Sequence, residues 1–288
     1  MTEELRTLKK PDLPPGIYTE MPPGAWDCPR LSDVLMLCQG HSLAEVRWRM
    51  LHKSKQTKAA LEGDMLHTMI LSPDRWEDLA GEAPINPKTG SEFGHDTKAY
   101  AEATEAWKAS HPGGFLVGVE QRERLEAIKS ALYDDKSTRK LLKTLERREF
   151  WAVWEEPTTG LTMRFRMDAF SAGTLWDLKT CKSLIYSDLQ QAVDDHGYDI
   201  QESLYLQALG DLEKAPDDFV FAFVRKSPPH GVTHVELPDN YLNVAYQEAL
   251  AALSLMAKAY ATDTWSPHPQ RLTVEAKRYR KRYLTLPE

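Results

Sequence analysis

The hydrophobic pattern of this 288-residue chain changes its period near residue 145, and this change constrains the fold more than any other feature. Three short runs rich in aromatic and β-branched residues follow one another there, and each is typical of a β-strand: EFWAVWE (149–155), LTMRFRMDAF (161–170) and TLWDLKT (174–180). The links between them, PTTG and SAG, are short and contain turn-forming residues. Because short links join antiparallel neighbours, we predict a three-stranded antiparallel meander.

Helical patterns precede this meander, and helices alternate with strands after it. Apolar residues recur at helical spacing between residues 31 and 73, at 97–109 and at 119–133, whereas residues 74–94 are typical of a loop. After the meander we predict a helix over 187–212, strands over 218–226 and 231–237, and a helix over 240–262. The expected fold class is α/β, with a central mixed β-sheet flanked by helices and a helical N-terminal region.

The chain divides into an arm and one large domain. Residues 1–30 contain six prolines and predict an extended N-terminal arm. Residues 31–288 are expected to form a single domain, with a helical part over 31–140, a sheet core over 145–240, and a C-terminal helix and basic tail over 240–288. A domain of this length can bury a large core.

Composition limits where such a protein can act. No stretch approaches the ~18 apolar residues that cross a bilayer, and the N-terminus lacks the apolar segment of a signal peptide. The three cysteines include no Cys-x-x-Cys pair. We therefore expect a cytoplasmic protein without a membrane partner. The formal net charge of −7 weakens a nucleic-acid role without excluding it, because a basic patch can lie on an acidic body.

The acidic and basic residues of the second and third predicted strands form the candidate site. Asp177 and Lys179 are two positions apart, so they emerge on the same face of a strand. Asp168 lies nine residues earlier on the neighbouring strand, and a short turn brings it beside Asp177. Carboxylates hold hard divalent cations, and a fixed ammonium orients water and offsets negative charge, which is what phosphodiester hydrolysis requires. A surface ion pair is the alternative reading of the same pattern.

In this region the sequence resembles the PD-(D/E)xK nuclease superfamily, and within it the RecE-type and related phage exonucleases. Five pieces match in order, over residues 63 to 205: Gly63–His67 with Leu71–Pro73, Glu149, Arg166–Asp168, Asp177–Thr180 and Gln201–Tyr205. One departure lies at Met167, where the name of the superfamily places a proline. The order of the pieces, rather than any single one, carries the resemblance.

The resemblance implies a role for each matched residue. A bound Mg²⁺ or Mn²⁺ would be held by His67, Asp168, Asp177 and the carbonyl of Leu178. Lys179 would position the attacking water, and Glu149 would help to hold a second metal ion or that water. Glu146 is a nearby alternative to Glu149. Gln201 and Tyr205 lie one helical turn apart, so they can together bind a phosphate, steady Lys179 or simply pack.

Basic residues near the motif are candidates for contacts with DNA phosphates. They are Arg164, Arg166, Lys182, Arg225 and Lys226. The tail segment Lys277–Tyr283 adds further cations with interleaved aromatic rings, although a solvated surface explains such a segment equally well.

The resemblance implies a metal-dependent exonuclease that acts on double-stranded DNA ends. It implies 5′-to-3′ digestion, a 3′ single-stranded overhang for recombination, a ring-like homo-oligomer and a possible single-strand annealing partner. Three alternatives remain open at this stage. They are an endonuclease or DNA-processing nuclease of the same superfamily, a non-catalytic DNA-binding protein of the same fold, and an unrelated α/β protein.

Overall fold

The computed structural model describes residues 13–52, 57–213 and 215–269, and a six-stranded mixed sheet lies at its centre. The strand order is β1-β4-β5-β6-β7-β8, in which only the β6–β7 pair is parallel. A separate pair, β2–β3, is parallel. The strands are β1 (Gly16–Tyr18), β2 (Ala80–Glu82), β3 (Phe115–Val117), β4 (Arg147–Glu155), β5 (Thr162–Ser171), β6 (Thr174–Cys181), β7 (Asp218–Arg225) and β8 (Val232–Val235).

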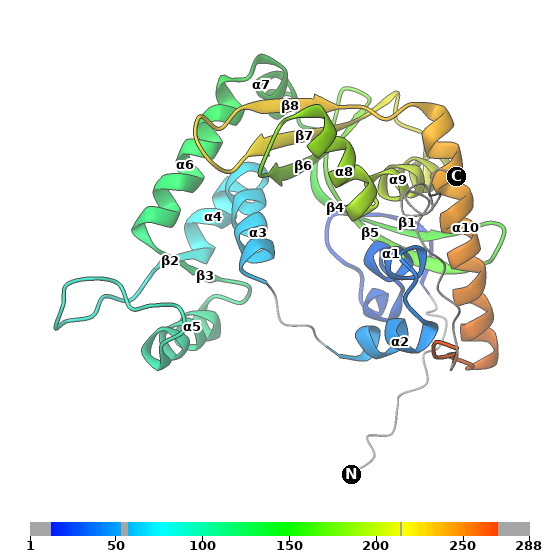
Figure 1. Ribbon diagram of the computed structural model, residues 1–288, viewed down its shortest axis with the longest axis horizontal. Helices are drawn as coiled ribbons and strands as arrows, with labels where there is room; N and C mark the ends of the chain where they lie inside the picture. Colours follow the sequence, from blue (N-terminus) through cyan, green and yellow to red (C-terminus); the bar gives the residue numbers. More distant parts are fainter. Residues whose placement is uncertain (1–12, 53–56, 214, 270–288) are drawn as a thin grey trace, which may run out of the picture.

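Helices cover both faces of this sheet (Figure 1). They are α1 (Leu31–Cys38), α2 (Leu43–Leu51), α3 (Lys58–Leu71), α4 (Pro73–Leu79), α5 (Lys98–Ser110), α6 (Val119–Asp134), α7 (Lys136–Lys143), α8 (Tyr186–His196), α9 (Tyr198–Leu212) and α10 (Asp239–Thr262), with a 3-10 turn at Ala25–Asp27. The α/β class and the mixed sheet are as the sequence predicts. Among the described residues no helix is long and apolar enough to span a membrane.

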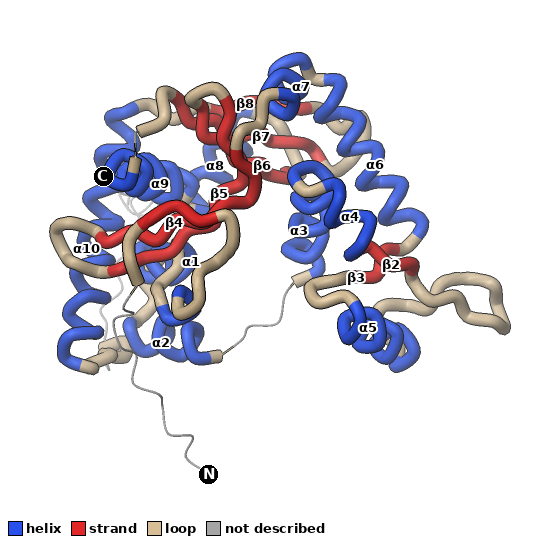
Figure 2. The backbone as a smooth tube through the Cα atoms, turned by 180° about the vertical axis from the view of Figure 1, so that it is seen from behind, coloured by secondary structure: helices blue, strands red, loops and turns tan. Residues whose placement is uncertain are grey.

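Two hydrophobic cores lie on opposite sides of the sheet. One joins α1, α2, α9 and α10 to the sheet and includes the rings of Phe165 and Phe221. The other joins α3, α4, α6 and α7 to the sheet through Trp176 and Leu178. The helical part expected over 31–140 is therefore shared between both faces, and Figure 2 shows α2 and α3 on separate sides of the molecule.

The antiparallel meander β4–β5–β6 is confirmed, and its register builds the site. Ala169 pairs with Trp176, so the next positions outward, Asp168 and Asp177, are neighbours across β5 and β6. Pairing of β4 with β5 continues on either side of Glu149, through Arg148 with Ala169 and Phe150 with Met167. This register places Asp168 beside Asp177, and Glu149 opposite Asp168.

Several local expectations are corrected. The stretch from residue 74 is not wholly a loop, because Pro73 begins helix α4 and β2 follows it directly. Helix α7 was not expected. The helix predicted over 187–212 is two helices, because Gly197 adopts a left-handed conformation (φ 63°) and ends α8. The extended arm contributes β1, which pairs with β4 and so belongs to the sheet.

Candidate active site

Strand β6 carries the acid-x-lysine pair at the centre of the site. The Lys179 ammonium lies 2.5 Å from Oδ1 of Asp177, and both side chains are largely buried. Gln201 on α9 joins them, because its Nε2 donates to Oδ2 of Asp177 while its Oε1 accepts from Nζ of Lys179 at 3.1 Å. Asp177, Lys179 and Gln201, which the sequence places together, are therefore one hydrogen-bonded unit.

The ring of Tyr198 lies against the Lys179 ammonium. The centroid of the Tyr198 ring lies 4.7 Å from Nζ, a distance at which the face of the ring attracts a cation. Sequence reasoning missed Tyr198. A signal was present, because Tyr198 lies one helical turn before Gln201 on the same helix and so shares its face.

Helix α3 brings an imidazole to the other side of the two strands. Nε2 of His67 lies 2.8 Å from the carbonyl oxygen of Leu178, and Nδ1 lies 3.4 Å from Oδ1 of Asp168. Oδ2 of Asp168 accepts a hydrogen bond from the backbone N–H of Leu178 at 2.8 Å. His67, Asp168 and Leu178, which were expected to bind metal, are thus in mutual contact next to Asp177.

The charges in this cluster set one another's protonation. Burial would lower the pKa of His67, but the charge and hydrogen bond of Asp168, together with the charge of Asp177, raise it to about 9. Burial would raise the pKa of Asp168, but the charges of His67 and Lys179 hold it below its ordinary value. Burial raises the pKa of Asp177 despite the Lys179 charge. The pKa of Lys179 is raised, because the charges of Asp177 and Asp168 outweigh burial, so its ammonium stays protonated.

The donor set fits a divalent cation. Oδ1 of Asp177 is buried and has no hydrogen-bond partner in the described chain, so its charge is met by the Lys179 ammonium as an ion pair. Carboxylates and a backbone carbonyl are ligands that suit Mg²⁺ and Mn²⁺, whereas an imidazole is more typical of transition-metal sites. Within the described ranges, no three His, Cys, Asp or Glu side chains are already grouped as metal ligands. Here the fourth expected donor is a main-chain oxygen, that of Leu178.

Glu149 and the alternative Glu146 have different partners in the structure. Glu149 is almost completely buried, and its Oε2 accepts a hydrogen bond from the hydroxyl of Ser72 at 2.6 Å. Arg166 donates to its Oε1, and Arg75 lies 3.6 Å from Oε2. Glu146 instead accepts from the backbone N–H of Ala172 and so holds the β5–β6 turn.

Tyr205 holds two elements together, whereas Gly63 has no comparable contact. The hydroxyl of Tyr205 donates to the carbonyl oxygen of Arg166 at 3.0 Å, so this buried ring ties α9 to β5. Gly63 lies one helical turn before His67 on α3, and a Cβ added there would meet no atom within 4 Å. The close approach of His67 to β6 therefore does not depend on the small size of Gly63.

The predicted DNA contacts separate into buried and accessible residues. Arg164 is buried, stacks on Trp26 with 5.1 Å between its guanidinium and the ring, and donates to the carbonyl of Cys28. It therefore anchors the N-terminal arm, and this position does not support the expected contact with DNA. Arg166 and Lys182 are exposed, and Arg225 is partly exposed. Lys226 pairs with Glu62 at 3.3 Å. The tail Lys277–Tyr283 lies outside the described residues.

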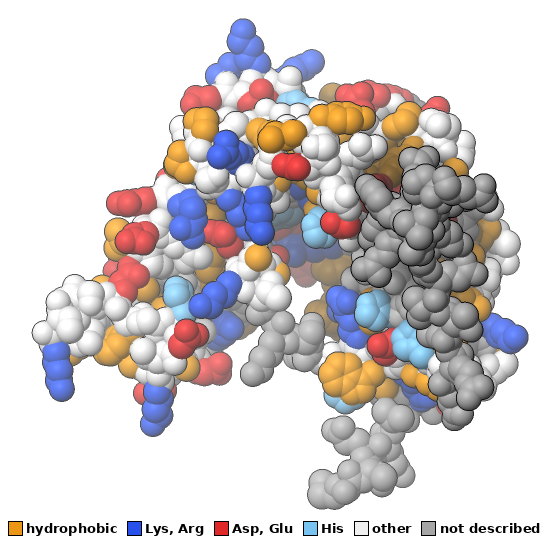
Figure 3. Space-filling view, viewed as in Figure 1, with side chains coloured by type: hydrophobic (Ala, Val, Ile, Leu, Met, Phe, Trp, Pro, Cys, Tyr) orange, Lys and Arg blue, Asp and Glu red, His pale blue; other side chains and the backbone are white. Residues whose placement is uncertain are grey.

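The space-filling view shows the molecule hollowed between α2 on one side and the α3–α6 helices on the other (Figure 3). Basic side chains gather beside this hollow, over α3 and α6. Arg124 on α6 and Lys226 after β7 share the carboxylate of Glu62 on α3, with distances of 2.6 Å and 3.3 Å.

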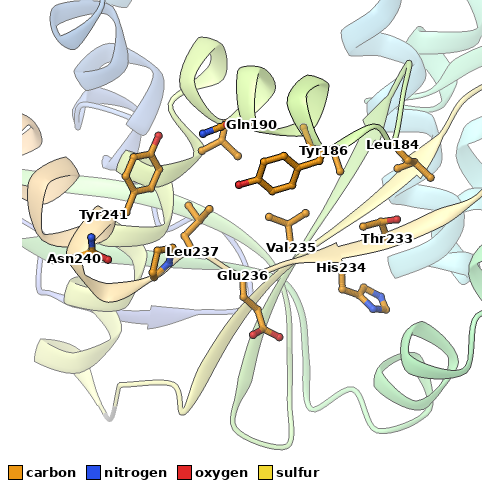
Figure 4. Close-up of a pocket in the computed structure, with 13 residues that line it drawn as sticks. Leu184, Tyr186, Gln190, Thr233, His234, Val235, Glu236, Leu237, Asn240 and Tyr241 are labelled. Carbon is orange, nitrogen blue, oxygen red and sulfur yellow. The ribbon is translucent and has the colours of Figure 1, made fainter.

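A second cavity lies apart from the charged cluster. It has a volume of about 530 Å³ and is formed between α8 and the segment from β8 to the start of α10. In Figure 4, Val235 and Leu237 point toward Tyr186, whereas His234 and Glu236 point away from it. None of the catalytic candidates lines this largely apolar cavity.

Fold and site together define a class. An antiparallel meander presents Asp168, Asp177 and Lys179 beside a helical histidine, which is the arrangement of PD-(D/E)xK proteins. A family model described as "PDDEXK-like domain of unknown function (DUF3799)" matches residues 31–271, and the chain belongs to this family. The resemblance to the PD-(D/E)xK superfamily is therefore confirmed.

A solved structure extends this comparison. The chain is similar to the crystal structure of a protein from Eubacterium rectale described as a proposed exonuclease, with a TM-score of 0.56 and 14% sequence identity. The match covers 91% of this chain and 94% of that chain, so the two share their fold over nearly their whole length. No curated protein is a significant match to the sequence.

Proposed function

We propose that this protein is a metal-dependent nuclease, and more specifically an exonuclease that digests linear double-stranded DNA. The observation that carries the proposal is the convergence of His67, Asp168, Asp177 and Lys179 around the Leu178 carbonyl. A surface ion pair does not explain this convergence, because the side chain of Asp177 is only 5% exposed. A non-catalytic DNA-binding protein would have no use for the complete set.

Each residue has a part in the proposed reaction. His67, Asp168, Asp177 and the Leu178 carbonyl would hold Mg²⁺ or Mn²⁺, which supplies an activated water and stabilises charge on the phosphoryl oxygens. The Lys179 ammonium, fixed by Asp177 and Gln201, holds its proton and orients the water by donating a hydrogen bond from Nζ. Gln201 keeps that ammonium in place.

The finer features of the proposal rest on the resemblance to RecE-type exonucleases. They are 5′-to-3′ polarity, 3′ overhangs for recombination, a ring of identical subunits, a single-strand annealing partner and a cytoplasmic location. Arg166, Lys182, Arg225 and Lys226 would contact the DNA backbone, which fits their positions on or near the surface.

The test uses a linear duplex labelled at one 5′ end, a closed circle of the same sequence, and Mg²⁺ or Mn²⁺ with an EDTA control. Metal-dependent release of the label from the linear DNA, with the circle intact, supports an exonuclease with 5′ polarity. Cutting of the circle would change the assignment to an endonuclease or DNA-processing nuclease. Binding without cutting under every divalent metal would leave a non-catalytic DNA-binding protein.

A further inference from the structure

Two neighbouring depressions lie beside α10, and Tyr241 lines both of them. The larger is the apolar cavity of about 530 Å³, and Figure 4 shows Tyr241 at one end of it. The smaller has a volume of about 290 Å³ and lies between α1, the junction of α8 with α9, and α10. Together they form one groove, called the α10 groove, which extends from Leu184 past Tyr241 to Cys38 and Glu248.

The smaller half of the α10 groove is acidic. It is lined by Asp194, Asp199 and Glu248. The hydrogen bond to Asp194, burial and the charges of all three carboxylates raise the pKa of Tyr241 to about 12, so the three act on one ring. Among the described residues, no lysine, arginine or histidine lies within ion-pair distance of these carboxylates. Their negative charge is therefore not offset within the described part of the chain.

A buried carboxyl adds to this acidic surface. Glu202 on α9 is 3% exposed, and its Oε2 has no hydrogen-bond partner among the described residues. Burial and the charges of Glu236, Asp199 and Asp239 raise the pKa of Glu202 to about 8, so these four carboxyls lie near one another. Glu236 lines the apolar half of the groove and Asp199 lines the acidic half. Acidic residues therefore border both halves, and a cationic ligand would stabilise their charges.

The larger half of the groove is apolar and open at its rim. Val235 and Leu237 point toward Tyr186 (Figure 4), and Tyr186 is 80% exposed. β8 is the last strand of the described sheet, so no further strand of that sheet covers this side. Exposed apolar surface with a polar rim marks a binding site. An occupant that fills both halves needs positive charge together with apolar or aromatic side chains.

The chain itself contains a segment with this chemistry. The tail segment Lys277–Tyr283 has five cations interleaved with two tyrosines, and Leu284 follows it. The segment lies outside the described residues, so its place is inferred from charge and reach. Its composition matches the groove in both respects, because the cations suit the acidic half and the rings suit the apolar half.

The length of chain after α10 is sufficient to reach the groove. His268 lies 2.8 Å from Glu45 on α2, which fixes the chain shortly after α10 ends at Thr262. Tyr241 lies 21 residues before that end, or roughly 32 Å along the helix. From His268 an extended chain spans roughly 50 Å over the fifteen residues to position 283. The tail segment can therefore return along α10 and cover both halves of the groove.

We propose that the α10 groove binds the tail segment Lys277–Tyr283 of the same chain, with its cations against the acidic half and a tyrosine ring in the apolar half. The proposal goes beyond the nuclease function and does not depend on it. It gives the basic segment of an acidic protein a binding place on the protein itself.

The experiment measures how fast trypsin cuts the tail of the full chain, because trypsin cleaves after lysine and arginine. Mass spectrometry follows cleavage after residues 277 to 282, without DNA, and a synthetic peptide of residues 271–288 gives the unprotected rate. A tethered segment has an effective concentration of about 1 mM, so an intrinsic Kd of about 0.1 mM leaves about a tenth of the tails free. Wild type should therefore be cut about tenfold more slowly than the peptide.

Variants locate the docking surface. Glu248→Lys reverses one exposed charge in the acidic half, and an intrinsic affinity about tenfold weaker would make tail cleavage about fivefold faster than in wild type. Tyr186→Ala removes the exposed ring at the apolar half and is expected to speed cleavage about threefold. Glu105→Lys is the matched control, because Glu105 is an exposed acid on α5, and its tail should be cut within about twofold of the wild-type rate.

The results either support the docked tail or overturn it. Cleavage of wild type at the rate of the free peptide would overturn the proposal. Equal rates for Glu248→Lys, Tyr186→Ala and Glu105→Lys would also overturn it, because the tail would then be protected elsewhere. Protection that increases with protein concentration would assign the groove to the tail of a second copy and overturn binding within one chain. If melting curves show that Glu248→Lys does not fold, Tyr186→Ala decides.

Discussion

The imidazole Nε2 of His67 lies 2.8 Å from the carbonyl oxygen of Leu178, although the two residues are 111 positions apart. This contact joins α3 to β6 and places the histidine at the carbonyl of Leu178, which is the residue between Asp177 and Lys179. Leu178 at the same time packs its side chain into the core beneath α3. The carbonyl oxygen of Leu178 therefore belongs to the candidate site, whereas the side chain of Leu178 packs in the hydrophobic core.

His67→Ala is expected to weaken Mn²⁺ binding at least tenfold, because even the loss of an outer-shell partner of a metal ligand costs ~10- to 100-fold in affinity. Isothermal titration calorimetry measures this directly without DNA. Glu105→Gln is a suitable control, because Glu105 is an exposed carboxylate on α5, and the Mn²⁺ affinity of this variant is expected to stay within about twofold of wild type. Equal losses in both variants would contradict the assignment of His67 as a metal ligand.

Tyr198→Ala is expected to lower kcat by up to about tenfold, because the ring face beneath the Lys179 ammonium is lost. Tyr198→Phe retains the ring and is expected to keep nearly all activity. The comparison is made under saturating DNA and metal, so that binding does not contribute. If both variants lose activity equally, the hydroxyl rather than the ring of Tyr198 supports the reaction.

Gly197→Ala is expected to destabilise the fold by about 1–3 kcal/mol. The residue has a φ of 63°, and an added Cβ would clash with Leu35 on α1. Gly63→Ala is the control variant with the opposite expected effect. The helical Gly63 has open space around it, so alanine should stabilise the folded protein by about 0.5–1 kcal/mol. Chemical denaturation of both variants tests the pair, and a stabilised Gly197→Ala would contradict the backbone assignment.

Glu202 makes the stability of the fold depend on pH. Its side chain is buried on α9, its Oε2 has no hydrogen-bond partner among the described residues, and burial together with the nearby charge of Glu236 raises its pKa to about 8. Between the ordinary pKa of 4.5 and 8, the unfolded chain loses this proton while the folded chain keeps it. Stability is therefore highest below this window and falls as pH rises through it.

Glu202→Gln is expected to remove this dependence. Relative to its own value at pH 5, the wild type should lose about 1–3 kcal/mol more than Glu202→Gln by pH 8, which calorimetric melting curves can resolve. If the free energy of unfolding changes by the same amount in the two proteins across this pH range, Glu202 is ionised in the folded state.

The meander and its acidic register could be predicted from the sequence because they depend on local information. A period of two, short turn segments and the spacing of Asp168, Asp177 and Lys179 are all contained within about thirty residues. Their matching order with an upstream histidine gave the superfamily. The kink between α8 and α9 could also have been read from Gly197, which separates two helical patterns.

Contacts that join distant segments could not be predicted in the same way. Nothing in the residues around Arg75 indicates that α4 would lie beside Glu149, since the contact depends on how the two cores pack on the sheet. Arg164 is the opposite case, in which the sequence suggested a contact that the structure does not support. Its neighbours in sequence suggest a DNA contact, yet the N-terminal arm covers it with Trp26 and buries its charge.

The most direct test of the central claim compares wild type with Lys179→Ala on a linear duplex, measuring both DNA binding and metal-dependent cleavage. Wild type is expected to digest the duplex in Mg²⁺ or Mn²⁺, whereas Lys179→Ala should bind it with similar affinity and cleave at least about a hundredfold more slowly. Cleavage by Lys179→Ala at the wild-type rate would contradict the assignment of this site as the catalytic centre.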